Sequence, residues 1–133
     1  MIFPQSIAIV EDEEDILKLF TEIIRQNGYP IVGYANPISF VRYLITHQDK
    51  FVLILIDYKM PQMTGCELAN QITKINPNVK MVLMTAANDI LNNNLNLELI
   101  HKPIKINEFV QIISHLYVSY DEVKVLMHDE YIP

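Results

Sequence analysis

The chain lacks the features that mark several large classes of protein. Its 133 residues include one cysteine, Cys66, so no intramolecular disulfide can form, which suits a reducing compartment. Lys and Arg are scarce: 10 of them face 16 acidic residues, the net charge is −6, and no basic run offsets it. Because nucleic-acid binding depends on clustered positive charge, we expect no such surface.

Long apolar runs are also missing. The longest, such as FVLILI, are far too short to span a bilayer, and MIFPQS at the start is not a basic segment leading into an apolar one. We therefore expect a cytoplasmic protein without a membrane segment or signal peptide. Half of the residues are hydrophobic, enough for the core of one domain of this length.

Short apolar runs alternate with segments of helical periodicity. The expected strands are Ser6–Val10, Ile31–Ala35, Phe51–Ile56, Lys80–Thr85 and Leu97–His101. The apolar residues at helical spacing are Ile16, Leu19, Phe20, Ile23 and Ile24; Phe40, Val41, Leu44 and Ile45; Leu68, Ile72 and Ile75; and Ile106, Phe109, Val110, Ile113, Leu116 and Tyr117. This alternation predicts an α/β fold in which helices cover both faces of a five-stranded parallel sheet.

One connection is unusually short. Only eleven residues separate Thr85 from Leu97, and five of them are asparagine, a poor helix former. A parallel crossover normally needs about a dozen residues, helix included. The fourth helix is therefore expected to be shortened or missing.

Polar residues follow four of the expected strands. Glu11 and Asp12 follow the first, Asp57 the third, Thr85 ends the fourth, and Lys102 follows the fifth. Because ligand chemistry collects at the carboxyl ends of strands in open α/β sheets, these side chains are expected to form one site.

The residue types suit phosphoryl transfer assisted by a metal. Carboxylates about 4 Å apart repel by ~4 kcal/mol at an effective dielectric constant near 20, which a cation among Glu11, Asp12 and Asp57 would relieve. Mg²⁺ accepts such ligands, and Asp57 could then act as the nucleophile. Lys102 would offset charge on the phosphoryl group rather than bind the metal, and Thr85 would hydrogen-bond a phosphoryl oxygen.

Structural explanations compete with each of these assignments. The acidic run EDEED suits a solvated helix start, where carboxylates are favourable. Asp57 could be a cap, Lys102 a surface lysine, and Thr85 an ordinary β-branched strand residue. The four segments together favour the functional interpretation, because they supply the metal ligands, the nucleophile, the hydroxyl and the lysine that phosphoryl transfer requires.

These segments resemble the receiver domain of two-component response regulators, of the stand-alone, chemotaxis-regulator-like kind. The matching pieces are IAIVED, LILIDYKMPQMTG, VLMTA and IHKPI, which stand in the family's order over about residues 6–118. The string DxxMPxxxG that starts at Asp57 is the most specific of them.

The resemblance implies a flavodoxin-like, doubly wound sheet with strand order 2-1-3-4-5. It implies a receiver domain at 1–118, a tail at 119–133 and no fused effector domain. A histidine kinase or phosphotransfer protein would phosphorylate Asp57 with Mg²⁺, and the switch would signal to an unknown downstream protein. The chain would assist its own phosphorylation and dephosphorylation without being an enzyme, and the Lys102–Pro103 peptide would be cis.

The chain departs from the family at Leu99, where receiver domains usually carry an aromatic residue that turns inward on activation. We therefore expect the switch to act through residues 86–96, drawn by Thr85 toward the phosphoryl group. If Leu99 is buried, its truncation to alanine should cost about 2–4 kcal/mol of stability.

Three other functions compete with this one. A degenerate receiver would act by protein contact without phosphorylation. An aspartyl-phosphate phosphatase of the haloacid dehalogenase type needs an aspartate where Lys59 stands, and a flavodoxin needs a phosphate-binding loop where EDEED stands. Apolar residues off the main stripe of the last helix, Ile112, Val118 and Tyr120, predict a homodimer or tail docking there.

Overall fold

Five parallel strands form one sheet in the order β2-β1-β3-β4-β5, which confirms the predicted flavodoxin-like order. The computed structural model describes residues 6–86 and 97–117. The strands are β1 (Ser6–Val10), β2 (Ile31–Tyr34), β3 (Phe51–Asp57), β4 (Lys80–Thr85) and β5 (Glu98–His101). The expected fourth helix falls within 87–96, outside the described residues.

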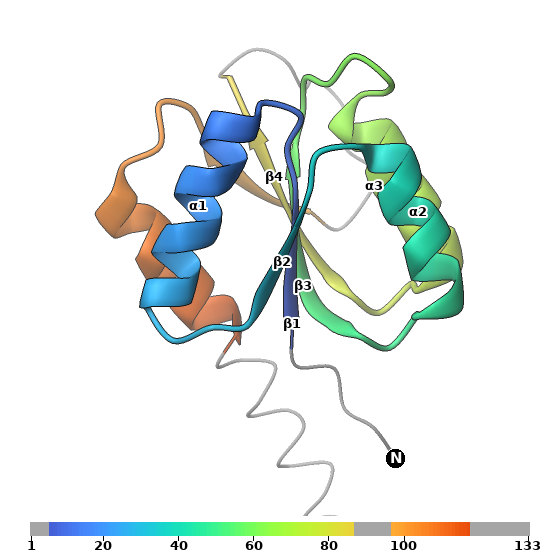
Figure 1. Ribbon diagram of the computed structural model, residues 1–133, viewed down its shortest axis with the longest axis horizontal. Coiled ribbons are helices and arrows are strands. Elements are labelled where there is room, and N and C mark those ends of the chain that lie inside the picture. Colours follow the sequence, from blue (N-terminus) through green and yellow to red (C-terminus); the bar gives the residue numbers. More distant parts are fainter. Residues whose placement is uncertain (1–5, 87–96, 118–133) are drawn as a thin grey trace, which may run out of the picture.

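Helices cover both faces of the sheet (Figure 1). On one face lie α1 (Glu14–Gln26) and a helix at 106–117, and on the other lie α2 (Pro37–Thr46) and α3 (Gly65–Ile75). β3 is buried along its whole length between the layers, as its apolar sequence predicts. Two hydrophobic clusters result, one on each side of the sheet.

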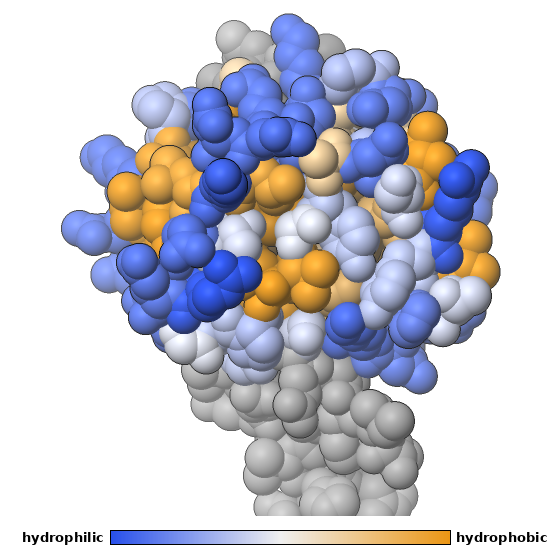
Figure 2. Space-filling view, in the orientation of Figure 1, coloured by the Kyte–Doolittle hydropathy of each residue, from blue (hydrophilic) through white to orange (hydrophobic). Residues whose placement is uncertain are grey.

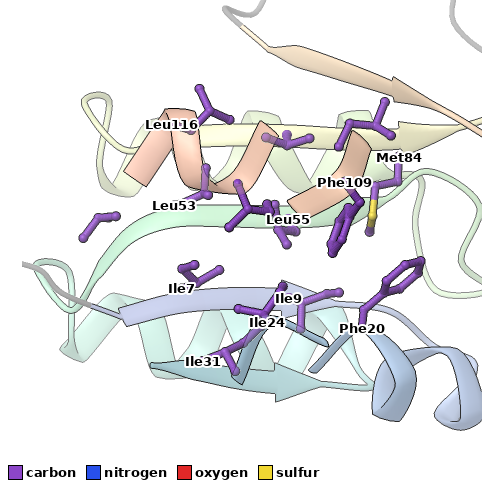
Figure 3. Packing of buried hydrophobic residues seen from close by; sticks show 14 residues of the cluster. Ile7, Ile9, Phe20, Ile24, Ile31, Leu53, Leu55, Met84, Phe109 and Leu116 are labelled. Carbon is purple, nitrogen blue, oxygen red and sulfur yellow. The ribbon is translucent and has the colours of Figure 1, made fainter. Parts of the chain in front are cut away.

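The first cluster joins α1 to the last described helix. The rings of Phe20 and Phe109 lie 4.8 Å apart between centroids, and Figure 3 shows them near each other, beside Leu55 and Ile9. Both side chains are almost fully buried, so they fix these two helices against β1 and β3. This packing places the starts of both helices beside the carboxyl edge of the sheet.

Local signals explain where two of the helices stop and start. α1 ends at Asn27, and the following Gly28 has φ of 91°, which a glycine adopts without strain. α2 begins at Pro37 after Asn36, whose Oδ1 accepts a hydrogen bond from the Ile38 N–H at 2.8 Å. The predicted strand bounds differ by one residue in β2, β3 and β5 only.

Three residues assigned to core stripes by their spacing are in fact exposed. Leu19, Ile45 and Ile106 expose 52 %, 53 % and 52 % of their surface. Leu19 and Ile45 each lie next to a buried residue, Phe20 and Leu44, whereas Ile106 is the first residue of its helix and has exposed neighbours. Figure 2 shows apolar surface on both sides of the molecule, over α1 with the last described helix and over α2.

Leu99 does not meet the condition of burial on which its expected stability cost depended. It is 38 % exposed, whereas the neighbouring Ile100 is 7 % exposed, because alternate residues of β5 point to opposite sides. We expect Leu99→Ala to cost less than about 1 kcal/mol of unfolding free energy and Ile100→Ala about 2–4 kcal/mol. Urea unfolding followed by circular dichroism would measure both, and equal costs would contradict this orientation.

Candidate functional site

The sheet register brings the predicted site residues to one edge. Backbone hydrogen bonds continue past the strand ends: the Tyr58 N–H donates to the Met84 carbonyl at 2.9 Å, and the Lys102 N–H donates to the Thr85 carbonyl at 2.7 Å. These bonds hold the residues that follow the strands in a fixed position. The edge is therefore a rigid platform for the side chains that it carries.

Three carboxylates gather on this platform. Glu11, Asp12 and Asp57 each place one oxygen so that all three lie within 4.8 Å of one another. Glu11 is 1 % exposed and Asp57 3 % exposed, and the Glu13 N–H donates to Glu11 Oε2 at 3.4 Å. Buried carboxylates this close are costly unless a cation joins them, so the oxygen-rich cluster fits Mg²⁺.

Lys102 contacts the cluster of three carboxylates through Asp57. Its Nζ donates to Asp57 Oδ1 at 2.6 Å, an ion pair between a half-buried and a buried side chain. Burial lowers the pKa of Lys102, but the hydrogen bond and the negative charge of Asp57 outweigh it, so this pKa lies above its ordinary value. The sequence placed Lys102 at the site but did not reveal this direct pairing.

Glu11 has the most perturbed acidity of the described site residues. Burial of its carboxyl group and then the charge of Asp57 raise the pKa of Glu11 from 4.5 to about 7. The Glu13 N–H and Lys102 act in the opposite direction but do not compensate. The cluster therefore holds a proton more readily than separate carboxylates would, and a divalent cation would displace that proton.

Thr85, the last residue of β4, is the remaining predicted site residue at this edge of the sheet. The residue is 2 % exposed, and its Oγ1 donates to the Ala86 carbonyl at 3.1 Å. The next strand carries His101, which is exposed, and the alternation along β5 predicts that its side chain points away from the site if Lys102 points into it. The contact of the Thr85 hydroxyl with a phosphoryl group remains a prediction.

A close backbone approach fixes the loop that follows Asp57. The Gly65 N–H donates to the Tyr58 carbonyl at 2.6 Å, and a Cβ at Gly65 would lie 2.5 Å from Leu83 Cδ1 and 2.7 Å from the Asp57 carbonyl oxygen. Thr64 caps α3 in a capping box with Glu67. The glycine of DxxMPxxxG was the sequence signal for this contact.

Gly65→Ala should disturb the site from outside the carboxylate cluster. The new methyl group would meet backbone as well as a side chain, so the loop must shift, at a cost of about 1–3 kcal/mol. Because the loop leaves directly from Asp57, Mg²⁺ should also stabilise the variant less than the native chain. Thermal melts with and without Mg²⁺ test this, and Gly28→Ala, which strains the backbone at φ of 91° without a close contact, is the control for a destabilising glycine substitution outside the Asp57 loop.

The fold and the edge of acids, hydroxyl and lysine define a receiver domain. The response regulator receiver domain family matches residues 7–114, and the chain belongs to this family. The match covers the whole described sheet except Ser6, and the Lys102–Pro103 peptide is cis.

Relatives of similar length support the same assignment. The response regulator receiver protein CpdR of Brucella abortus is 26 % identical over 118 residues, covering 85 % of this chain and 97 % of the relative. Sporulation initiation phosphotransferase F of Bacillus subtilis is 30 % identical over 86 residues, covering 65 % and 68 %.

Solved structures share the fold. A CheY-like receiver domain protein from Methanospirillum hungatei has a TM-score of 0.76 at 25 % identity, covering 90 % of this chain and 98 % of that chain. TrrA of Thermotoga maritima, solved in complex with Mg²⁺ and BeF, has a TM-score of 0.72 at 23 % identity, covering 84 % and 98 %. Among the described residues, no helix is long and apolar enough to cross a membrane.

Proposed function

We propose that this chain is a phosphorylation-dependent signalling switch in which Asp57 accepts the phosphoryl group. One observation carries the proposal: the buried Asp57 carboxylate lies within 4.8 Å of two further carboxylates and is held by Lys102. A purely structural ion pair needs one acid, whereas this site gathers three around one lysine. The surplus negative charge is suited to a cation and a phosphoryl group.

The transfer follows from the groups at the edge. An Asp57 oxygen attacks the phosphorus of a phosphohistidine on a kinase or phosphotransfer protein; a P–O bond forms, the P–N bond breaks, and the imidazole nitrogen leaves with the electron pair. Lys102 moves from Asp57 to the transferred phosphoryl oxygens, and Thr85 donates its hydroxyl to another. Glu11, Asp12 and Asp57 would hold Mg²⁺, which supplies positive charge at the site.

Apolar surface beside the site supports docking of the phosphoryl donor. Leu19 on α1 and Ile106 on the last described helix are both about half exposed, and Figure 2 shows apolar surface over this region. The two helices start at the edge that carries Asp57. A partner seated there could present its phosphohistidine to the site; a homodimer through the helix at 106–117 is a further proposal for the same surface.

The switch should act through Thr85 and residues 86–96. Leu99 offers no ring or hydroxyl to follow the movement of Thr85, so the segment next to Thr85 is the element that phosphorylation would bias. We expect phosphorylation to increase amide protection of 86–96 in the native chain. Thr85→Ala should accept the phosphoryl group but show no increase, which hydrogen exchange would measure; unchanged protection in the native chain would contradict this mechanism.

A degenerate receiver is the second candidate, since it would share the fold. Incubation with phosphoramidate distinguishes the two candidate functions, because this reagent carries the same kind of P–N bond as phosphohistidine. The intact native chain should gain the mass of one phosphoryl group in the presence of Mg²⁺, and Asp57→Asn should gain none. Failure of the native chain to gain mass, with Mg²⁺ binding demonstrated, would favour the degenerate receiver.

A further inference from the structure

The outer face of α2 is apolar and cationic. Ile38 and Ile45 are 42 % and 53 % exposed and lie seven residues apart, which places them on the same side of the helix. Arg42, the only charged residue of α2, is exposed between them. Figure 2 shows this apolar surface at the side of the molecule where α2 lies.

This face differs in charge from the other exposed apolar positions. No Asp or Glu occurs between Glu22 and Asp49, although the chain contains 16 such residues. By contrast, Leu19 lies three residues before Glu22 on α1, Leu99 follows Glu98 on β5, and Ile106 lies two residues before Glu108. Of the described apolar patches, the α2 face is therefore the one that suits a segment with both apolar and acidic side chains.

We propose that the last eight residues of the chain, 126–133, dock on the α2 face of the same molecule. Their sequence, LMHDEYIP, combines four large apolar residues with two adjacent acids. Asp129 and Glu130 would pair with Arg42, while the apolar residues would cover Ile38 and Ile45. These eight residues lie outside the described part of the chain.

The position of the last described helix allows this contact. Tyr117 packs on Tyr29, 4.9 Å between ring centroids, just before β2 begins, so the helix ends at the amino edge of the sheet. α2 runs opposite to the strands, and Ile45 therefore lies near the same edge (Figure 1). The sixteen residues after 117 can extend over about 50 Å. That length exceeds the width of a domain whose radius of gyration is about 13 Å.

A paramagnetic label at position 133 would test the contact in the 133-residue chain. The label would be attached to Pro133→Cys in a Cys66→Ala background, and amide signals would be followed by NMR. We expect strong broadening of the amides at 38–46 and little broadening of α1. Both Arg42→Glu and Ile45→Asp should remove the broadening, and Arg42→Glu combined with Asp129→Lys and Glu130→Lys should restore it.

Leu19→Asp is the matched control, because Leu19 and Ile45 are equally exposed, and it should leave the broadening unchanged. A second control mixes two kinds of chain: one carries the paramagnetic label but no isotope enrichment, and the other is isotope-enriched but carries no paramagnetic label. The amide signals of the enriched chain should show no broadening. Broadening in that mixture would mean that the tail binds a second copy and would overturn the intramolecular assignment. Weak broadening everywhere, or broadening centred on β5 or on 106–117, would overturn the docking site.

Discussion

Lys102→Ala is expected to slow phosphorylation of Asp57 by about a hundredfold or more. The ammonium group is the only described cation in contact with Asp57, and a preorganised charge of this kind is typically worth two to three orders of magnitude in rate. The same change should make Mg²⁺ bind more tightly, because the 2.6 Å ion pair competes with a metal for the Asp57 carboxylate. From the sequence alone, Lys102→Ala was expected to leave Mg²⁺ binding nearly intact.

Two measurements separate these effects. The rate of mass gain with acetyl phosphate reports the chemistry, and the shift of the melting temperature with Mg²⁺ concentration reports binding. Lys59→Ala is the matched control, since Lys59 is exposed and only two residues from Asp57. A Lys102→Ala chain that is phosphorylated at the native rate would contradict a role of Lys102 in stabilising the transferred phosphoryl group.

Glu11→Gln is expected to stabilise the metal-free protein at alkaline pH. The pKa of Glu11 rises from 4.5 in the unfolded chain to about 7 in the fold, so the native state binds the proton more tightly. The stability gained from that proton is fully present below about pH 4.5 and is lost as pH rises through 7. A shift of this size corresponds to about 3 kcal/mol, which the neutral glutamine should retain at pH 8.

Mg²⁺ should offset most of this pH dependence in the native chain. The metal needs the deprotonated carboxylates, and a ligand at about a hundred times its Kd adds ~2.7 kcal/mol of stability. Urea unfolding at pH 5 and pH 8, with and without Mg²⁺, would show a large metal effect only at pH 8. A native chain whose metal-free stability rises between these two pH values would contradict the assignment of Glu11.

The sheet and the members of the site were largely predictable from the sequence. A strand buried on both faces, such as β3, is wholly apolar, and a carboxylate at its end stands out against that run. The register of a parallel sheet then brings Glu11, Asp57 and Lys102 to one edge whatever the details of packing. The order of the strands came from the resemblance to receiver domains, since alternation alone does not fix it.

Contacts that depend on side-chain direction were not predictable. Leu19, Ile45 and Ile106 have the spacing of core residues, but a helix lying on a sheet buries a narrower stripe than spacing alone indicates. Likewise, the sequence places Lys102 at the edge without showing that its long side chain reaches back to Asp57. Such contacts depend on the angle between elements, which no local pattern encodes.

The location of the phosphoryl group tests the central claim most directly. The 133-residue chain would be incubated with acetyl phosphate and Mg²⁺ and digested at low temperature, and the masses of its peptides would be measured. Our account predicts one phosphoryl group on the peptide that contains Asp57, absent without Mg²⁺ and strongly reduced in Asp12→Ala. A phosphoryl group on another peptide, or one that forms equally well in Asp57→Asn, would contradict it.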